Sequence, residues 1–139
     1  MPSQEPVQVV CGIIHYNGQV LATRRNSAGR YPLLWEFPGG KVEADESPES
    51  ALHRELKEEL DFDVCEVTPL EWVNYVDRDF SITLIPFVCK PAQTEGPVPH
   101  EHSEVRWIDP ADALQLTWAP ADIPLVENLE ITIESHGNE

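Results

Sequence analysis

A short predicted helix is the feature that most constrains what this chain can fold into. Ser47 followed by Pro48 marks its start, because serine caps a first turn and proline is favoured at the first helical position. The helix is expected to run to about Leu60, and Leu52 and Leu56 precede that residue at four-residue spacing. The three leucines therefore form one apolar strip, which we expect to face a hydrophobic core.

Three glutamates occupy the helix sector beside this strip. At about 100° per residue, Glu59 lies about 40° to one side of Glu55 and Glu58 about 60° to the other. Like charges at this spacing repel one another by a few tenths of a kcal/mol, and a bound cation would relieve that repulsion. Carboxylates converging on one spot suit Mg²⁺ or Mn²⁺. A solvated acidic helix face is the alternative that these residues alone leave open.

The residues just before the helix favour the metal site. Gly39 and Gly40 in "FPGGK" allow the backbone to bend closely around a ligand, and the Gly39 carbonyl oxygen is a candidate metal ligand. Glu46 and Arg54 are expected to pair and to hold this loop against the helix. An Arg54 on the surface, without a partner, is the alternative.

The rest of the chain alternates strand and turn patterns. An Asn-Gly turn at residues 17–18 separates two β-rich runs. Three further segments read as strands, "FDVCEVTPLEWVNYV", "SITLIPFVCK" and "EVRWID", while "PADALQL" and "PADIPLVENL" read as short helices entered through proline. Residues 90–102 read as a long loop. The expected fold is one α+β domain over residues 1–139, with a mixed sheet and flanking helices.

Charge and composition limit the kinds of molecule that this protein can be expected to bind. The net charge is −16, from nine Lys and Arg against 25 Asp and Glu, so a nucleic-acid polymer would be repelled. A small phosphorylated ligand is compatible with this charge if metal ions and local basic residues offset it. There is no run of 18 apolar residues and no signal-like start. The three cysteines are far apart, which favours reduced thiols. We therefore expect a cytoplasmic protein without a membrane partner.

The segment from Gly40 to Phe62 resembles the conserved box of the Nudix hydrolases. That box reads Gly, five residues, Glu, seven residues, Arg-Glu-aliphatic-x-Glu-Glu-x-Gly-aliphatic. Eight of its nine positions agree here, namely Gly40, Glu46, Arg54, Glu55, Leu56, Glu58, Glu59 and Phe62. The departure is Asp61, where the family has a glycine that ends the helix in a left-handed conformation; an aspartate there costs about 1 kcal/mol.

The resemblance implies a Nudix fold, an α/β/α sandwich, and hydrolysis of a nucleoside diphosphate linked to another group. It implies that Glu55, Glu58 and Glu59 bind Mg²⁺, or Mn²⁺ in its place, with help from the Gly39 carbonyl. In the MutT-like branch an acidic loop residue also reaches the metal. Glu101 in "PHEHSE", six residues before Trp107, resembles it.

The implied catalytic residues are Glu55, Glu58, Glu101 and Arg54. Either Glu55 or Glu101 would take the proton of the attacking water, and the sequence leaves that choice open. His100 and His102 flank Glu101 and are expected to be solvated loop residues; a catalytic or metal-binding role for them is the alternative, ranked below Glu101.

The resemblance extends beyond the box. "WEFPGGKVE", "HEHSEVRWIDPADAL" and "APADIPL" are similar to MutT-like nucleoside triphosphate pyrophosphohydrolases, both the CTP type and those acting on oxidised purine nucleotides. Arg25 and Lys41 resemble phosphate contacts of this branch. Phe37 resembles a wall for the base, with Tyr75 and Trp118 as weaker candidates. Asp122 resembles the residue that reads the base edge.

The sequence allows two roles for the Asp122 side chain. An ionised carboxylate accepts hydrogen bonds from a guanine-type base or from the amino group of cytosine. Alternatively, Asp122 is the N-cap of the last helix.

The expected activity is Mg²⁺-dependent conversion of a nucleoside triphosphate to the monophosphate and pyrophosphate. CTP, dCTP or 8-oxo-dGTP would be the substrate, as part of nucleotide-pool sanitising, and the protein would be a monomer or homodimer. Hydrolysis of a nucleoside-diphosphate sugar or a dinucleotide, or nucleotide binding without turnover, are the alternatives.

Overall fold

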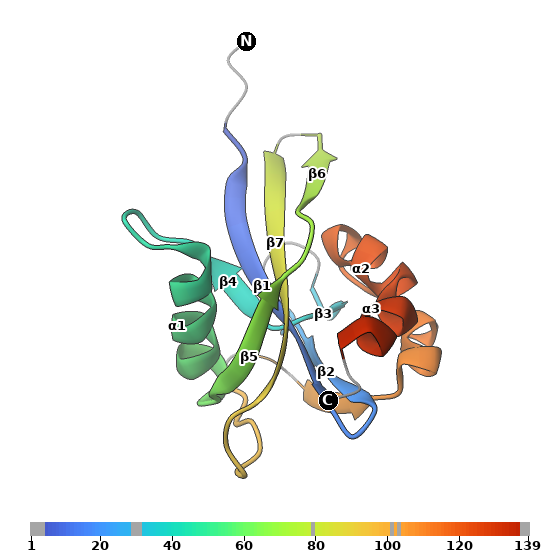
Figure 1. Ribbon diagram of the computed structural model, residues 1–139. Helices are drawn as coiled ribbons and strands as arrows, with labels where there is room; N and C mark the ends of the chain where they lie inside the picture. Colours follow the sequence, from blue (N-terminus) through green and yellow to red (C-terminus); the bar gives the residue numbers. More distant parts are fainter. Residues whose placement is uncertain (1–4, 29–31, 79, 101, 103, 137–139) are drawn as a thin grey trace.

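A mixed β-sheet lies between one helix on one side and a group of helices on the other (Figure 1). The structure is a computed structural model and describes residues 5–28, 32–78, 80–100, 102 and 104–136. Helix α1 (Pro48–Leu60) covers one face. Helices α2 (Ile123–Glu127) and α3 (Leu129–His136) cover the other. The predicted α+β fold, with a mixed sheet between layers of helix, is confirmed.

Two long neighbouring strands form the centre of the sheet. Strand β1 (Val7–Tyr16) runs parallel to β7 (Phe80–Pro91), and the other pairings are antiparallel. The main strand order is β3-β2-β1-β7-β5, with β4 paired to β1, β6 to β7 and β8 to β2. The remaining strands are β2 (Gln19–Arg24), β3 (Trp35–Glu36), β4 (Gly39–Lys41), β5 (Val64–Pro69), β6 (Val73–Asp77) and β8 (Glu104–Ile108).

The hairpin between β1 and β2 is built as the sequence predicts. Asn17 and Gly18 both have positive φ, 54° and 79°, which is the requirement of a type I′ turn. Tyr16 pairs with Gln19 across it. This turn fixes the register of β2 and therefore the place of Arg25, which follows β2 directly.

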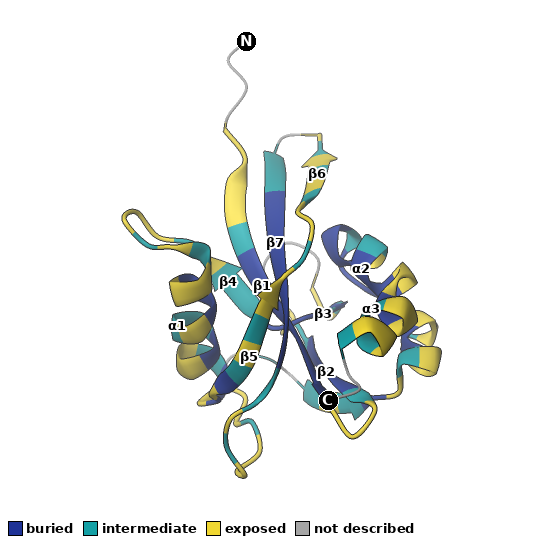
Figure 2. Ribbon diagram, in the orientation of Figure 1, coloured by how far each residue is buried: buried dark blue, intermediate teal, exposed yellow. Residues whose placement is uncertain are grey.

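Successive side chains of β1 point to opposite faces and enter two separate cores. In Figure 2 the strand changes from exposed at its start to buried further along. Val10 and Ile14 pack toward α1, while Cys11 and Ile13 pack toward the C-terminal helices. The leucine strip of α1, Leu52, Leu56 and Leu60, is fully buried in the first core. Burying such side chains contributes roughly 1.5–3 kcal/mol each, so α1 is firmly fixed to the sheet.

Helix α1 begins and ends as expected. Ser47 caps it by accepting from the Ser50 N–H, and Pro48 is its first residue. Asp61 ends it in the left-handed conformation, at φ 51° and ψ 46°, although it is not glycine. Its carboxylate lies 3.5 Å from the Lys57 ammonium.

The C-terminal region differs from the prediction. "PADALQL" forms a 3₁₀ helix, η1 (Pro110–Gln115), and "PADIPLVENL" forms another, η2 (Pro120–Asp122), followed by α2. Helix α3 was not predicted; its apolar pattern is weak, and only Leu129 is buried. None of the helices described is long and apolar enough to cross a membrane. The cysteines are free, with Cys11 and Cys89 buried.

Candidate active site

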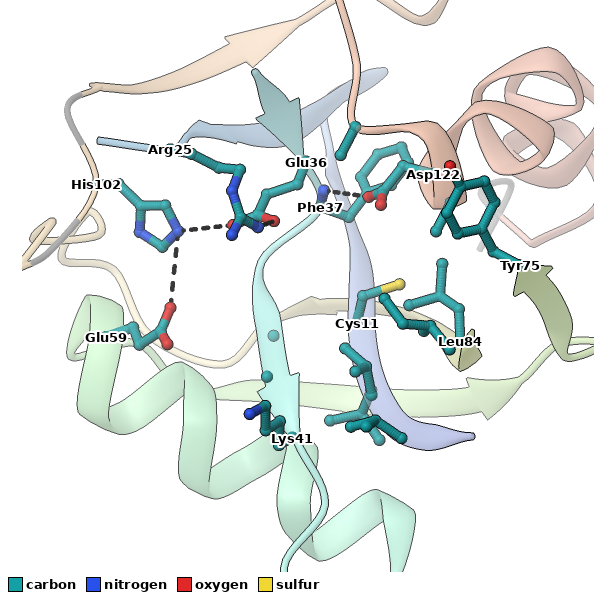
Figure 3. A pocket seen from close by; sticks show the side chains of 18 of the residues that line it. Cys11, Arg25, Glu36, Phe37, Lys41, Glu59, Tyr75, Leu84, His102 and Asp122 are labelled. Atoms are coloured by element: carbon teal, nitrogen blue, oxygen red, sulfur yellow. Dashed lines mark hydrogen bonds and ion pairs between the residues drawn. The ribbon is translucent and has the colours of Figure 1, made fainter. Parts of the chain in front are cut away.

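A cavity of about 540 Å³ lies over the β1, β3 and β4 segment between the helix layers, and it has two chemically different ends (Figure 3). One end is charged and is lined by Arg25, Glu36, Lys41, Glu59 and His102. The other is largely apolar and is lined by Val9, Cys11, Phe37, Tyr75, Ile82, Leu84 and Asp122. A ligand with one anionic and one flat apolar part fits this division.

The two glycines of "FPGGK" are required by close packing. Strand β4 lies so near β1 that a Cβ on Gly39 would be 1.9 Å from the Val10 carbonyl oxygen. A Cβ on Gly40 would be 2.2 Å from the Glu55 carboxyl carbon. The sequence predicts that these glycines bend the backbone around a ligand. In the structure they belong to a short strand, and the absence of a side chain at Gly40 leaves room for the Glu55 carboxylate.

Arg54 is the centre of an ion-pair cluster at the start of the box. Its Nε lies 2.7 Å from Glu46 Oε2, which confirms the predicted pair, and its Nη2 donates to the Lys41 carbonyl oxygen at 2.9 Å. The other terminal nitrogen lies 3.1 Å from Glu55 Oε2 and 3.2 Å from Glu58 Oε1. Hydrogen bonds from Arg54 lower the pKa of Glu46 to about 2. Arg54 thus ties the loop before α1 to two box carboxylates.

Glu59, the third of the three glutamates expected to bind metal, points elsewhere, so the expected convergence is not present. Glu59 Oε1 lies 3.7 Å from His102 Nε2, on the cavity side of α1. Within the described part of the chain, no three His, Cys, Asp or Glu side chains are grouped closely enough to hold a metal ion. Glu55 and Glu58 lie beside Arg54, and Glu59 lies beside His102.

The donor set nevertheless fits a hard divalent cation. All three side chains offer carboxylate oxygens, the ligands that Mg²⁺ and Mn²⁺ prefer. The Glu55 carboxylate is only 12% exposed and is seated over Gly40, where no side chain competes for the space. Glu58 is 60% exposed and Glu59 is 27% exposed, so both are accessible to an ion from solvent.

Sequence reasoning missed Glu36. This residue of β3 lines the cavity, and its Oε1 lies 2.7 Å from an Arg25 terminal nitrogen. Its Oε2 lies 3.2 Å from His102 Nε2. The available signal was an acidic residue between Trp35 and Phe37 in an otherwise apolar stretch. The expectation of a solvated His102 is wrong, because its side chain is only 6% exposed.

Phe37 and Asp122 meet at the apolar end. The Phe37 ring is buried and stacks on Trp118, with 4.9 Å between ring centroids. The Phe37 backbone N–H donates to Asp122 Oδ2 at 2.8 Å. Asp122 occupies the N-cap position of α2, but its side chain makes no cap hydrogen bond. The carboxyl group therefore lines the cavity and does not cap the helix.

Asp122 is not the simple carboxylate that the sequence suggests. Burial raises its pKa to about 8, and the negative charge of Glu36 adds to the effect. The Phe37 N–H and Arg25 act in the opposite direction. At neutral pH the group is therefore mostly protonated and is both a donor and an acceptor.

Lys41 and Glu101 are the two remaining residues of the predicted site. Lys41 is exposed at the charged end of the cavity, next to the box, where it is accessible to an anion. Glu101 lies outside the described residues. Its neighbour His100 donates its backbone N–H to the Glu59 carbonyl oxygen at 3.1 Å, so this part of the loop contacts the end of α1.

Comparisons with known proteins agree with this site. The family model of the NUDIX domain matches residues 6–129. The chain is 42% identical over 123 residues to the CTP pyrophosphohydrolase of Escherichia coli, covering 87% of this chain and 89% of that protein. It is 30% identical over 125 residues to the 8-oxo-dGTP diphosphatase of E. coli, covering 89% and 96%. The solution structure of the E. coli ORF135 protein superposes with a TM-score of 0.78 at 34% identity, covering 97% of this chain and 96% of that one.

Fold and site together define an enzyme that hydrolyses phosphoric anhydrides of nucleotides. The chain belongs to the Nudix hydrolase family, and within it to the MutT-like members. Nudix hydrolases use divalent metal ions, in agreement with the donor set of α1.

Proposed function

We propose that this Nudix hydrolase is a Mg²⁺-dependent nucleoside triphosphate pyrophosphohydrolase that acts on cytosine nucleotides (CTP, dCTP) or on 8-oxo-dGTP. Water and the triphosphate would give the nucleoside monophosphate and pyrophosphate. The observation that carries the proposal is a buried, hydrogen-bonded Asp122 at the apolar end of a cavity whose other end holds Glu59 and Lys41.

The cavity matches such a substrate in size and polarity. Small-molecule sites commonly measure about 300–1,000 Å³, and this one is about 540 Å³. A base needs flat apolar walls and a few polar groups at its edge. Phe37, Tyr75 and Leu84 supply apolar surface, and Asp122 supplies the polar group. Arg25 and Lys41 are the basic side chains at the charged end, where they support a place for phosphates.

The protonation state of Asp122 decides which base edge it matches. A neutral carboxyl donates its O–H and accepts with its carbonyl oxygen, which complements N3 and the amino group of cytosine. An ionised carboxylate accepts only, which complements N1–H and the amino group of a guanine-type base. With a pKa of about 8, Asp122 provides the cytosine pattern at pH 7 and the guanine pattern in more alkaline solution.

The metal would be held by Glu55, Glu58 and Glu59, with the Gly39 carbonyl and Glu101 assisting. When bound, it neutralises phosphate charge and lowers the pKa of a coordinated water. Arg54 keeps Glu55 and Glu58 on the α1 face that meets β4. Glu55, packed over Gly40, or Glu101 would take the proton of the attacking water.

The names of two similar proteins, a CTP pyrophosphohydrolase and an 8-oxo-dGTP diphosphatase, support the same substrates. We extend the proposal to nucleotide-pool sanitising, and so to mutation avoidance, in the cytoplasm. The protein would act as a monomer or homodimer, without a nucleic-acid or membrane partner.

A substrate screen tests the proposal. Purified protein with Mg²⁺ is incubated with normal and oxidised nucleoside triphosphates, ADP-ribose and a dinucleotide polyphosphate, and the products are quantified separately. We expect the highest kcat/KM for CTP, dCTP or 8-oxo-dGTP. Activity confined to ADP-ribose or the dinucleotide would keep the fold and metal site but overturn the substrate assignment.

A further inference from the structure

His102 lies between two carboxylates that belong to different layers of the molecule. Its Nε2 is 3.2 Å from Glu36 Oε2 on β3 and 3.7 Å from Glu59 Oε1 on α1. In Figure 3 both interactions converge on the same imidazole nitrogen. The His102 side chain is 6% exposed. Its contact with Glu36 has hydrogen-bond length, whereas its 3.7 Å contact with Glu59 is an ion-pair distance.

The contacts continue beyond Glu36. Glu36 Oε1 lies 2.7 Å from the Arg25 guanidinium, so Glu59, His102, Glu36 and Arg25 form one connected row. All four residues line the cavity. The row joins the metal-binding face of α1 to the basic residue that we assign to the phosphates.

The geometry indicates which imidazole nitrogen carries the proton. Nε2 faces the two carboxylates, which can only accept. Nδ1 is buried and has no hydrogen-bond partner among the residues that the structure describes. The arrangement therefore favours a proton on Nε2, donated to Glu36 at the shorter distance while Glu59 lies at the longer one.

Backbone contacts hold the loop of His102 independently of its side chain. The Val98 N–H donates to the Leu60 carbonyl oxygen at 2.8 Å, and the His100 N–H to the Glu59 carbonyl oxygen at 3.1 Å. Both hydrogen bonds join backbone atoms, so neither uses the His102 side chain. The imidazole is thus not required to attach the loop to α1, and its distinct contribution is to the two carboxylates.

We propose that His102 is a positioning residue that orients Glu59 for metal binding and couples it, through Glu36, to Arg25 at the phosphate end of the cavity. The inference rests on the proposed function, because it takes Glu59 as a metal ligand. It concerns a residue outside the box and explains why a loop histidine is buried between acidic side chains. Removing partners that orient metal ligands typically costs 10–100-fold in metal affinity or activity.

The test compares three variants by Mn²⁺ binding without nucleotide, measured by electron paramagnetic resonance of free Mn²⁺, and by steady-state kinetics. We expect His102→Ala to weaken Mn²⁺ binding and to lower kcat/KM by about tenfold each. His102→Gln, whose amide can replace the Nε2 donor, should retain most of the wild-type Mn²⁺ affinity and most of the wild-type kcat/KM. His100→Ala is the matched control on the same loop; its side chain is exposed and its contact with Glu59 is a backbone one, so it should behave as wild type.

A second arm uses Glu36→Gln alone and combined with His102→Ala. We expect the double variant to bind Mn²⁺ about as weakly as His102→Ala, because the two residues act through one contact. Unchanged Mn²⁺ affinity in His102→Ala would overturn the inference, as would equal losses in the Ala and Gln variants. If wild type binds Mn²⁺ but turns over no nucleoside triphosphate, the proposed function fails while the binding comparison still decides the role of His102.

Discussion

The backbone N–H of Phe37 donates to Asp122 Oδ2 at 2.8 Å, and this hydrogen bond joins residues 85 positions apart in the chain. It fixes a buried carboxyl group beside an aromatic wall, at the end of the cavity that we assign to the base. Burial raises the pKa of Asp122 to about 8, so its hydrogen-bonding pattern changes within an accessible pH range. Substrate choice should change with it.

The preference for CTP over 8-oxo-dGTP should therefore fall as pH rises. Asp122 is mostly neutral below its pKa and ionised above it, and the neutral fraction falls about tenfold per pH unit once the pKa is passed. We expect the ratio of kcat/KM for the two substrates to decrease between about pH 6.5 and about pH 8.5. Asp122→Asn is the control, because an amide keeps one donor and one acceptor at every pH. The same decrease in that variant would contradict the role of Asp122.

Asp122 should also make folding stability depend on pH. Its pKa is about 8 in the folded protein against 3.8 for an ordinary aspartate. The folded state thus retains a proton that the unfolded state releases. The contribution of this proton to the free energy of unfolding is fully present below the unfolded-state pKa of 3.8 and is lost as pH rises to the folded-state pKa of about 8. The whole effect is on the order of 5 kcal/mol.

Chemical denaturation at about pH 5 and about pH 8 measures this effect. Wild type should lose more unfolding free energy over that interval than Asp122→Asn, which has no proton to release. Parallel losses in the two proteins would show that Asp122 is ionised in the folded state already at low pH.

The Glu46–Arg54 pair should matter for activity although neither residue lines the cavity. Arg54 holds Glu55 and Glu58, so releasing it from Glu46 should let both carboxylates move. We expect Glu46→Gln to lower kcat/KM by about tenfold. Glu43→Gln is the matched control, since Glu43 is more exposed and lies 3.8 Å from the same guanidinium.

The pH dependence of this pair has the opposite sign to that of Asp122. The pKa of Glu46 is lowered to about 2, so its contribution to stability is present above its ordinary value of 4.5 and is lost as pH falls toward 2. Glu46→Gln should remove that acid-side loss. Acid unfolding curves that coincide for wild type and Glu46→Gln would contradict the strength assigned to the pair.

Asp61→Gly should stabilise the protein slightly and leave turnover unchanged. Asp61 adopts the left-handed conformation at φ 51°, which costs about 1 kcal/mol relative to glycine. The variant loses only the exposed Lys57 contact, and such pairs contribute about 0–1 kcal/mol. Asp61→Ala keeps the backbone strain and should be less stable than Asp61→Gly in denaturant titrations. A fall in kcat/KM for Asp61→Gly would assign this residue a part in the site.

Local features of this molecule could be predicted and contacts between distant segments could not. The limits of α1, the Asn17–Gly18 turn and the Glu46–Arg54 pair follow from spacing within a few residues. The row through Glu36 and His102 joins residues 66 positions apart, and it depends on how β3 and the loop after β7 meet.

The same limit applies to chemical state and side-chain direction. Asp122 could be placed near the base from the resemblance, but its raised pKa comes from burial beside Glu36, which only the fold reveals. Spacing put Glu55, Glu58 and Glu59 in one helix sector. It could not show that Arg54 holds the first two while Glu59 turns toward His102.

Product analysis tests the central claim most directly. Pyrophosphate and orthophosphate are measured separately during hydrolysis of CTP and 8-oxo-dGTP with Mg²⁺, for wild type and for Glu58→Gln. We predict one pyrophosphate per nucleoside monophosphate in wild type, and a loss of at least about tenfold in the variant, because a carboxylate that we assign to the metal is removed. Release of orthophosphate, or full activity of Glu58→Gln, would contradict a metal-dependent pyrophosphohydrolase built on the carboxylates of α1.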